Sequence, residues 1–170
     1  EYLFVCAGLQ TILRTYEHEY GNDWEHLGDH VCVHTNDTHP AMCGPELMRI
    51  LVDEKGVDFD LAFKIATQTC SYTNHTIMPE ALEKWPIALY SRLLPRIYMI
   101  TEEIDRRYRE SFDRTLPNWE SLLANTAILW DGQVRMANLS IIGSYSVNGV
   151  AALHTEILKE DTLHDFYVLE

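Results

Sequence analysis

Apolar residues recur every three or four positions in several stretches of the chain, which is the spacing of a helix with one buried face. The predicted helices are residues 2–19, 45–55, 59–66, 87–94, 95–110 and 151–159. Gly21 and Gly56 are expected to end the first two, and Asp58 is the expected N-cap of the third. Residues 116–125 lack such a pattern and are predicted to be a surface connection.

Short β-prone segments lie between these helices. Residues 31–34 and 70–73 are each bounded by helical patterns, whereas residues 127–130 and 133–136 flank Asp131-Gly132, a pair suited to a type I′ turn. Val147-Asn-Gly-Val150 is expected to be a tight segment in which Gly149 permits positive φ or a close backbone approach. The alternation predicts an α/β fold with a mostly parallel sheet flanked by helices and one β-hairpin.

Composition narrows the class of protein. With 170 residues and 46% hydrophobic content, the chain has enough apolar surface for a globular core. A net charge of −13 argues against a nucleic-acid partner. No apolar run approaches a membrane span, and the first residues lack the basic region of a signal peptide. Four cysteines without a CxxC pair are expected to be buried, reduced thiols of a cytoplasmic protein.

The two ends suggest a larger protein. The chain starts inside a helical pattern without an initiator Met, and Phe166-Tyr-Val-Leu169 is an apolar run without an evident partner. We therefore expect residues 1–170 to be a fragment truncated at both ends.

Two polar clusters directly follow predicted strands. Asn36-Asp-Thr-His-Pro40 follows residues 31–34, and Asn74-His-Thr76 follows residues 70–73. Strand-end loops are where α/β folds place ligand sites, so Asp37, His39 and His75 are expected to come together. From the residues alone, His75 could equally cap the next helix, and the first cluster could be an Asx-turn with a surface histidine.

Three other kinds of catalytic site have weaker support in the sequence. His34, His39 and His75 could form a metal site, but their spacing matches no known ligand pattern. A serine hydrolase would need a GxSxG elbow, which the sequence lacks. Glu80 and Glu83 could be the carboxylate pair of a glycosidase, but they equally suit a helix N-terminus.

A set of motifs, in one order along nearly the whole chain, resembles the α-glucan (glycogen) phosphorylases. The motifs are Asn36-Asp-Thr-His-Pro40, Pro45-Glu-Leu-Met-Arg49, Tyr72-Thr-Asn-His-Thr76, Pro79-Glu-Ala-Leu-Glu83 and Val147-Asn-Gly-Val150. The resemblance implies that residues 1–170 are the later part of the Rossmann-like N-terminal domain of a two-domain, GT-B type glycosyltransferase. The family's enzymes are several times longer than this chain.

The resemblance also implies roles for individual residues. His75 would contact the 6-hydroxyl of the reacting glucosyl unit, with its backbone carbonyl near the positive charge that develops on the ring. Asp37 and His39 would line the neighbouring pocket and help hold His75. Thr76 and Glu83 would line the same pocket, Val150 would contact the glucosyl unit, and Asn148 would be structural.

At two places the sequence differs from the family pattern, and there we do not transfer residue roles from the family. The family commonly has His before its AlaValAsnGly segment, whereas this chain has Tyr145, to which we assign no role. The helix that begins at Pro95 matches a glycogen-anchoring region of some animal members, but its residues diverge, and we do not transfer that site.

The implied activity is the reversible, retaining transfer of a terminal glucosyl unit from an α-1,4-glucan to inorganic phosphate, giving glucose 1-phosphate. Pyridoxal 5′-phosphate (PLP) would be bound by the absent C-terminal domain, and its phosphate would assist as acid and base. The fragment alone would be inactive, and the full-length protein is expected to be a homodimer. The alternatives are a noncatalytic structural or interaction fragment and a metal-dependent hydrolase.

Overall fold

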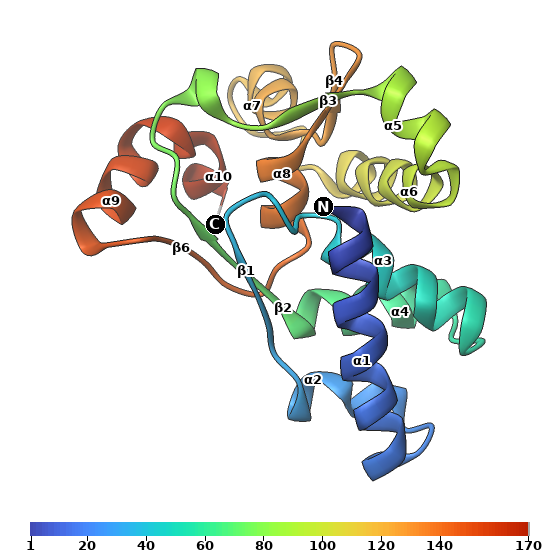
Figure 1. Cartoon of the computed structure of the whole chain (residues 1–170). Coiled ribbons are helices and arrows are strands. Elements are labelled where there is room, and N and C mark those ends of the chain that lie inside the picture. Colours follow the sequence, from blue (N-terminus) through green and yellow to red (C-terminus); the bar gives the residue numbers. More distant parts are fainter. Residues whose placement is uncertain (170) are drawn as a thin grey trace.

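The computed structural model describes residues 1–169, apart from the side chain of Pro79. Its central element is a parallel sheet of three strands in the order β1-β2-β6 (Figure 1). The strands are β1 (Val33–Asn36), β2 (Cys70–Asn74) and β6 (Val147–Gly149). Asn36 pairs with Thr73, and Asn74 pairs with Gly149. The predicted α/β class and parallel sheet are therefore confirmed.

Helices connect the strands as parallel pairing requires. The chain begins with α1 (Tyr2–Tyr20), and a 3₁₀ turn (Trp24–His26) and α2 (Leu27–His30) lead from it to β1. The crossover from β1 to β2 contains α3 (Cys43–Arg49), a π-helical turn (Ile50–Glu54) and α4 (Phe59–Thr69). Asp58 caps α4 as predicted, since its Oδ1 accepts from the N–H groups of Asp60 and Leu61.

The longer connection from β2 to β6 contains a second, antiparallel sheet in the order β3-β5-β4. Its elements are a 3₁₀ turn (Pro79–Ala81), β3 (Lys84–Pro86), α5 (Ile87–Leu93), α6 (Pro95–Ser111), α7 (Trp119–Thr126), β4 (Leu129–Trp130), β5 (Gln133–Arg135) and α8 (Met136–Ile142). Asp131 and Gly132 have φ of 49° and 70°, which confirms the type I′ hairpin turn.

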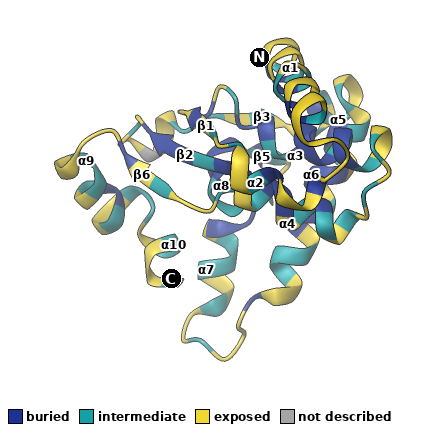
Figure 2. Ribbon diagram, turned by 90° about the horizontal axis from the view of Figure 1, so that it is seen from below, coloured by how far each residue is buried: buried dark blue, intermediate teal, exposed yellow. Residues whose placement is uncertain are grey.

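After β6 the chain forms α9 (Ala152–Ile157), a π-helical turn (Leu158–Thr162) and α10 (His164–Leu169). In Figure 1, these orange and red elements lie on the β6 side of the sheet, opposite α3, α4 and α6. No residue of α9 or α10 is buried (Figure 2). No helix of the described residues is long and apolar enough to cross a membrane.

The structure corrects several sequence predictions. Residues 119–126 form α7, where a surface connection was expected, and α7 follows Asn118 in the left-handed conformation with φ of 60°. The first strand begins two residues later than predicted, and its last residue, Asn36, is part of the polar cluster. The segment ending at Gly149 is a strand without positive φ, so of the two reasons expected for this glycine only a close backbone approach remains. Cys43 and Cys70 are buried as expected, but Cys32 is exposed.

The main core lies between α1, α3, α4 and α6. Each helix contributes the apolar face that its sequence pattern predicts, and Figure 2 shows the buried positions within these elements. The fully or nearly fully buried side chains include Leu9, Leu13, Leu47, Ile50, Ile65, Ile97, Ile100 and Ile104. This packing supports the sheet from one side and leaves the carboxyl ends of the strands accessible.

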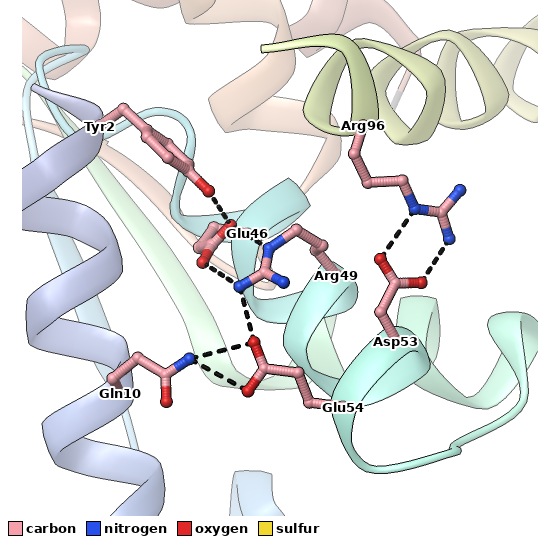
Figure 3. Close-up of polar contacts among 7 residues, drawn as sticks. All are labelled: Tyr2, Gln10, Glu46, Arg49, Asp53, Glu54 and Arg96. Atoms are coloured by element: carbon pink, nitrogen blue, oxygen red, sulfur yellow. Dashed lines mark hydrogen bonds and ion pairs between the residues drawn. The ribbon is translucent and has the colours of Figure 1, made fainter.

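A buried carboxylate joins α1 to α3 (Figure 3). Glu46 is completely buried; its Oε2 accepts from the Tyr2 hydroxyl and from Arg49 Nε, both at 2.8 Å. Arg49 Nη2 donates to Glu46 Oε1 at 2.8 Å and to Glu54 Oε1 at 2.9 Å. Burial, with the nearby carboxylate, raises the pKa of Tyr2 to about 12. The negative charge of Glu46 is thus neutralised inside the protein by one bidentate partner.

The π-helical turn directs two consecutive acidic side chains towards different helices (Figure 3). Glu54 accepts from Gln10 of α1, at 3.2 Å to each carboxylate oxygen. Asp53 accepts a bidentate pair from Arg96 of α6, at 2.6 and 2.8 Å, and this guanidinium lowers the pKa of Asp53. One wide turn therefore ties α3 to both α1 and α6.

These two arginines allow a matched test of burial. Arg49→Met would leave Glu46 buried without its ionic partner, and we expect a loss of about 3 kcal/mol or more in the free energy of unfolding. Arg96→Met removes an equally well-formed pair whose side chains are 41% and 32% exposed, and it should cost less than about 1 kcal/mol. Urea-unfolding midpoints of both variants and the parent protein measure the difference. Equal losses would contradict a special role for the buried pair.

Candidate functional site

Three predicted site residues lie at one edge of the parallel sheet. Asp37 follows β1, His75 follows β2 and Val150 follows β6, so all three emerge from the carboxyl ends of paired strands. The strand register pairs Asn36 with Thr73 and Asn74 with Gly149, so Asp37, His75 and Val150 each directly follow the paired strand ends. The sheet therefore brings together residues that are far apart in sequence, at the edge where α/β folds hold ligands.

His75 has an exposed side chain that contacts β1. Its Nε2 lies 2.5 Å from Oδ1 of Asn36. Because an amide oxygen only accepts, Nε2 donates and carries a proton, which leaves Nδ1 of a neutral ring free to accept. Within residues 1–169, no hydrogen bond joins His75 to Asp37 or His39, so the residue that holds this imidazole is Asn36.

Asp37 adopts a strained backbone conformation at the end of β1. Its φ is 66°, which is uncommon for a residue other than glycine. The Asp37 N–H donates to the carbonyl of Thr73 at 2.8 Å, and its Oδ1 accepts from the Thr38 N–H at 2.7 Å. These bonds turn the chain sharply away from the sheet and leave the Asp37 carboxylate half-buried beside the strand ends.

Glu83 joins the loop after β1 to the second sheet. Its Oε2 accepts from the hydroxyl of buried Thr38 at 2.6 Å, and its Oε1 accepts from Trp85 Nε1 at 2.9 Å. The Glu83 backbone carbonyl accepts from the Met136 N–H at 3.1 Å. Glu83 therefore fixes the shape of the Asp37 loop. It is not paired with Glu80, which is exposed in the preceding 3₁₀ turn.

His39 lies on the other side of its loop. Together with Glu1, Phe4 and Pro40, it lines an apolar groove of about 470 Å³ beside α1. Burial raises the pKa of Glu1, and the neighbouring Glu83 carboxylate adds to this shift. The expected convergence of Asp37, His39 and His75 is thus seen for the strand-end positions of Asp37 and His75, whereas His39 borders the groove.

Thr76 and Val150 are both fixed through their backbones. The Thr76 N–H donates to Asn74 Oδ1 at 2.9 Å, and the Val150 N–H donates to the Asn74 carbonyl at 3.1 Å. Val150 keeps 53% of its surface exposed, and its backbone is bonded to Asn74, the residue before His75. Asn148 accepts from the Thr73 hydroxyl at 2.9 Å, which agrees with the structural role predicted for it.

Gly149 lies against the first turn of α9. A Cβ at this position would be 2.8 Å from His154 Cδ2 and 2.8 Å from the Thr155 backbone nitrogen. The predicted close backbone approach is therefore confirmed at Gly149. The contact holds α9 directly against the end of β6.

The roles of four side chains at this edge were not predicted from the sequence: Asn36 as partner of His75, Thr38 as partner of Glu83, and the buried Asn74 with its contact to His154. Asn36, Thr38 and Asn74 belong to the two polar clusters, which are the signal that could have found them. His154 lies in an ordinary helical pattern, and no local signal distinguishes it.

The carboxyl edge of the parallel sheet carries neither a metal-binding cluster nor a lysine among the described residues. Among residues 1–169, no group of three or more His, Cys, Asp or Glu side chains is arranged to hold a metal ion. His34, proposed as one such ligand, instead contacts the Thr73 hydroxyl at 2.5 Å. The lysines of the chain are Lys55, Lys64, Lys84 and Lys159, and none of them directly follows a strand of the parallel sheet.

Comparison with known proteins assigns the chain to a family. The family model described as carbohydrate phosphorylase matches residues 1–170. This chain belongs to the carbohydrate phosphorylase family. A glycogen phosphorylase of Bacillus subtilis is 48% identical over 169 residues, which are 99% of this chain and 21% of that protein. Human brain-form and Macaca fascicularis muscle-form glycogen phosphorylases are 42% and 43% identical over 100% of the chain and 21% of their own lengths.

The chain thus spans about a fifth of the length of these curated phosphorylase relatives. The resemblance inferred from the five sequence motifs is confirmed, and the site described above lies within the matched residues.

We expect Gly149→Ala to destabilise the protein by about 1–3 kcal/mol, because its Cβ meets backbone as well as a side chain of α9. Gly8→Ala is the matched control: Gly8 lies in α1 with nothing within 4 Å of a Cβ, and alanine should stabilise the helix by up to about 1 kcal/mol. Opposite shifts of the thermal unfolding midpoint are expected. Two shifts of the same sign would contradict the close approach at β6.

Proposed function

We propose that this chain is part of the Rossmann-like N-terminal domain of an α-1,4-glucan phosphorylase with a two-domain, GT-B type architecture. The complete protein would transfer a terminal glucosyl unit from a glucan to inorganic phosphate, with retention of configuration, and release glucose 1-phosphate. The observation that carries the proposal is the position of His75, at the carboxyl edge of the parallel sheet and held by Asn36, in a chain of the phosphorylase family.

The geometry suits a sugar hydroxyl. With Nε2 bound to Asn36, Nδ1 of the exposed His75 ring is left to accept a hydrogen bond from the glucosyl 6-hydroxyl. Val150 offers an exposed apolar surface beside it for the carbon face of the ring. Asp37 and Thr76 flank the same edge, and Glu83 fixes the loop that carries Asp37 through Thr38. In this proposal, His39 contributes from the groove side of the loop.

The backbone contributes as well. Asn74 and Thr76 hold the peptide units on both sides of His75, so its carbonyl dipole is fixed before substrate arrives. A fixed dipole stabilises positive charge that develops on a glucosyl ring without a cost of reorganisation in the transition state. This is the catalytic contribution that we assign to His75, besides its contact with the hydroxyl.

PLP, the cofactor that the proposed activity implies, does not fit the residues of this edge. A Schiff base requires a lysine, and the described strand ends carry Asp37, His75 and Val150 without a neighbouring lysine in the loop. Lys55 and Lys159 are paired with Glu17 and Glu156. We therefore assign PLP, and the phosphate-binding residues, to another part of the complete protein.

In the complete protein, His75→Ala should lower kcat/KM roughly 5- to 150-fold, because one hydrogen bond in a closed site is worth about 1–3 kcal/mol. A donor that lacks the 6-hydroxyl, 6-deoxy-glucose 1-phosphate, gives the sharper measurement. The parent protein should lose rate on this donor, and His75→Ala should lose little more, since the partner is already absent. PLP content should stay unchanged. Independent, additive penalties would show that His75 does not contact that hydroxyl.

The 170-residue chain alone should release no glucose 1-phosphate when it is incubated with PLP, a glucan and phosphate. It provides the His75 edge but no lysine at that edge to bind the cofactor. A coupled assay for glucose 1-phosphate checks this expectation, with the complete protein as the positive control. Phosphorolysis by the chain alone would contradict the assignment of the cofactor to another part of the protein.

A further inference from the structure

Asn74, the last residue of β2, is fully buried, and its side-chain amide joins three segments. Nδ2 donates to the Tyr72 hydroxyl at 2.8 Å. Oδ1 accepts from the Thr76 N–H at 2.9 Å and contacts His154 Nε2 at 3.2 Å. Because an amide oxygen only accepts, His154 is the donor in this contact. Both acceptor positions of Oδ1 are therefore used.

These bonds surround His75. The bond from the Thr76 N–H closes an Asx-turn of which His75 is the middle residue. The Asn74 carbonyl, at the start of the same turn, accepts from the Val150 N–H. The orientation of one buried amide thus sets the backbone direction of His75, and with it the direction of the imidazole towards Asn36.

His154 is itself held against the sheet. Its ring lies over Gly149, where an added Cβ would be 2.8 Å from Cδ2, and the neighbouring Thr155 hydroxyl accepts from the Gly149 N–H at 3.0 Å. No residue of α9 is buried, so these contacts at the strand end are what fix the start of α9. The His154 imidazole thus lies between the end of β6 and Asn74.

We propose that His154 is a positioning residue for the reaction: by donating to Asn74 Oδ1 it locks the Asx-turn that aims His75 at the glucosyl unit. The inference rests on the proposed function for the identity of that ligand. The inference adds that α9 and His75 are coupled through the Asn74 side-chain amide. His154 itself does not touch the substrate.

A purely structural role makes a different prediction. If His154 only held α9 in place, its loss would lower activity on every donor by the same factor. If it acts through His75, the loss falls on the contact with the 6-hydroxyl. The ratio of kcat/KM for glucose 1-phosphate to that for 6-deoxy-glucose 1-phosphate separates the two roles.

The variants are made in the complete protein. His154→Leu keeps the approximate size but removes the donor, whereas His154→Gln keeps an N–H that can reach Asn74. His164→Leu is the matched control, because His164 lies in α10 and contacts the Lys159 carbonyl instead. We expect the donor ratio to fall about three- to tenfold in His154→Leu and to be largely restored in His154→Gln. It should be unchanged in His164→Leu. The double variant His154→Leu/His75→Ala should be no worse than His75→Ala.

Hydrogen exchange gives a readout that does not depend on activity. The Thr76 and Val150 amides are bonded to Asn74, so exchange in peptides covering residues 72–78 and 147–151 should accelerate severalfold in His154→Leu and recover in His154→Gln. Unchanged exchange, or an unchanged donor ratio in an active His154→Leu protein, would overturn the inference. A parent protein without phosphorolysis would instead refute the proposed function, and the exchange result would still decide whether His154 holds the turn.

Discussion

The parallel pairing of β1, β2 and β6 is the constraint on which the geometry of the site depends. A one-residue slip in register would turn every side chain of a strand to the opposite face and move the residues that follow it. With Asn36 opposite Thr73 and Asn74 opposite Gly149, the three chain segments leave the sheet at the same level. The short strands are kept in this register by packing of α4 and α8 against β2, and by side-chain bonds such as that from Thr35 to the Ser71 carbonyl at 2.9 Å.

Much of the fold could be predicted from local pattern. The amphipathic helices, the Asp58 cap and the Asp131-Gly132 hairpin all follow from signals within a few residues. Strand β3 of the antiparallel sheet could not be predicted in this way. Lys84–Pro86 is short and contains a proline, and it becomes a strand because Trp85 pairs with Val134. The helix α7 was missed for a related reason, since it starts after a left-handed Asn118 and buries only Thr126.

The candidate site was predictable in position but not in its contacts. Polar clusters after strands located Asp37, His75 and the loops that carry them, because strand ends and loops have local signatures. The partners that orient these residues are distant in sequence: Asn36 is 39 positions from His75, and His154 is 80 positions from Asn74. The burial of Glu46 has the same origin, because only the folded chain brings Tyr2 of α1 to a carboxylate of α3. No periodicity records such pairings.

Glu83 has a mechanical consequence. One carboxylate oxygen is attached to Thr38, in the loop that extends the parallel sheet, and the other to Trp85, in the antiparallel sheet. Neither attachment is to a flexible partner, since Thr38 is buried and Trp85 is paired within its sheet. A displacement of the Asp37 loop would therefore be transmitted through the Glu83 carboxylate to β3.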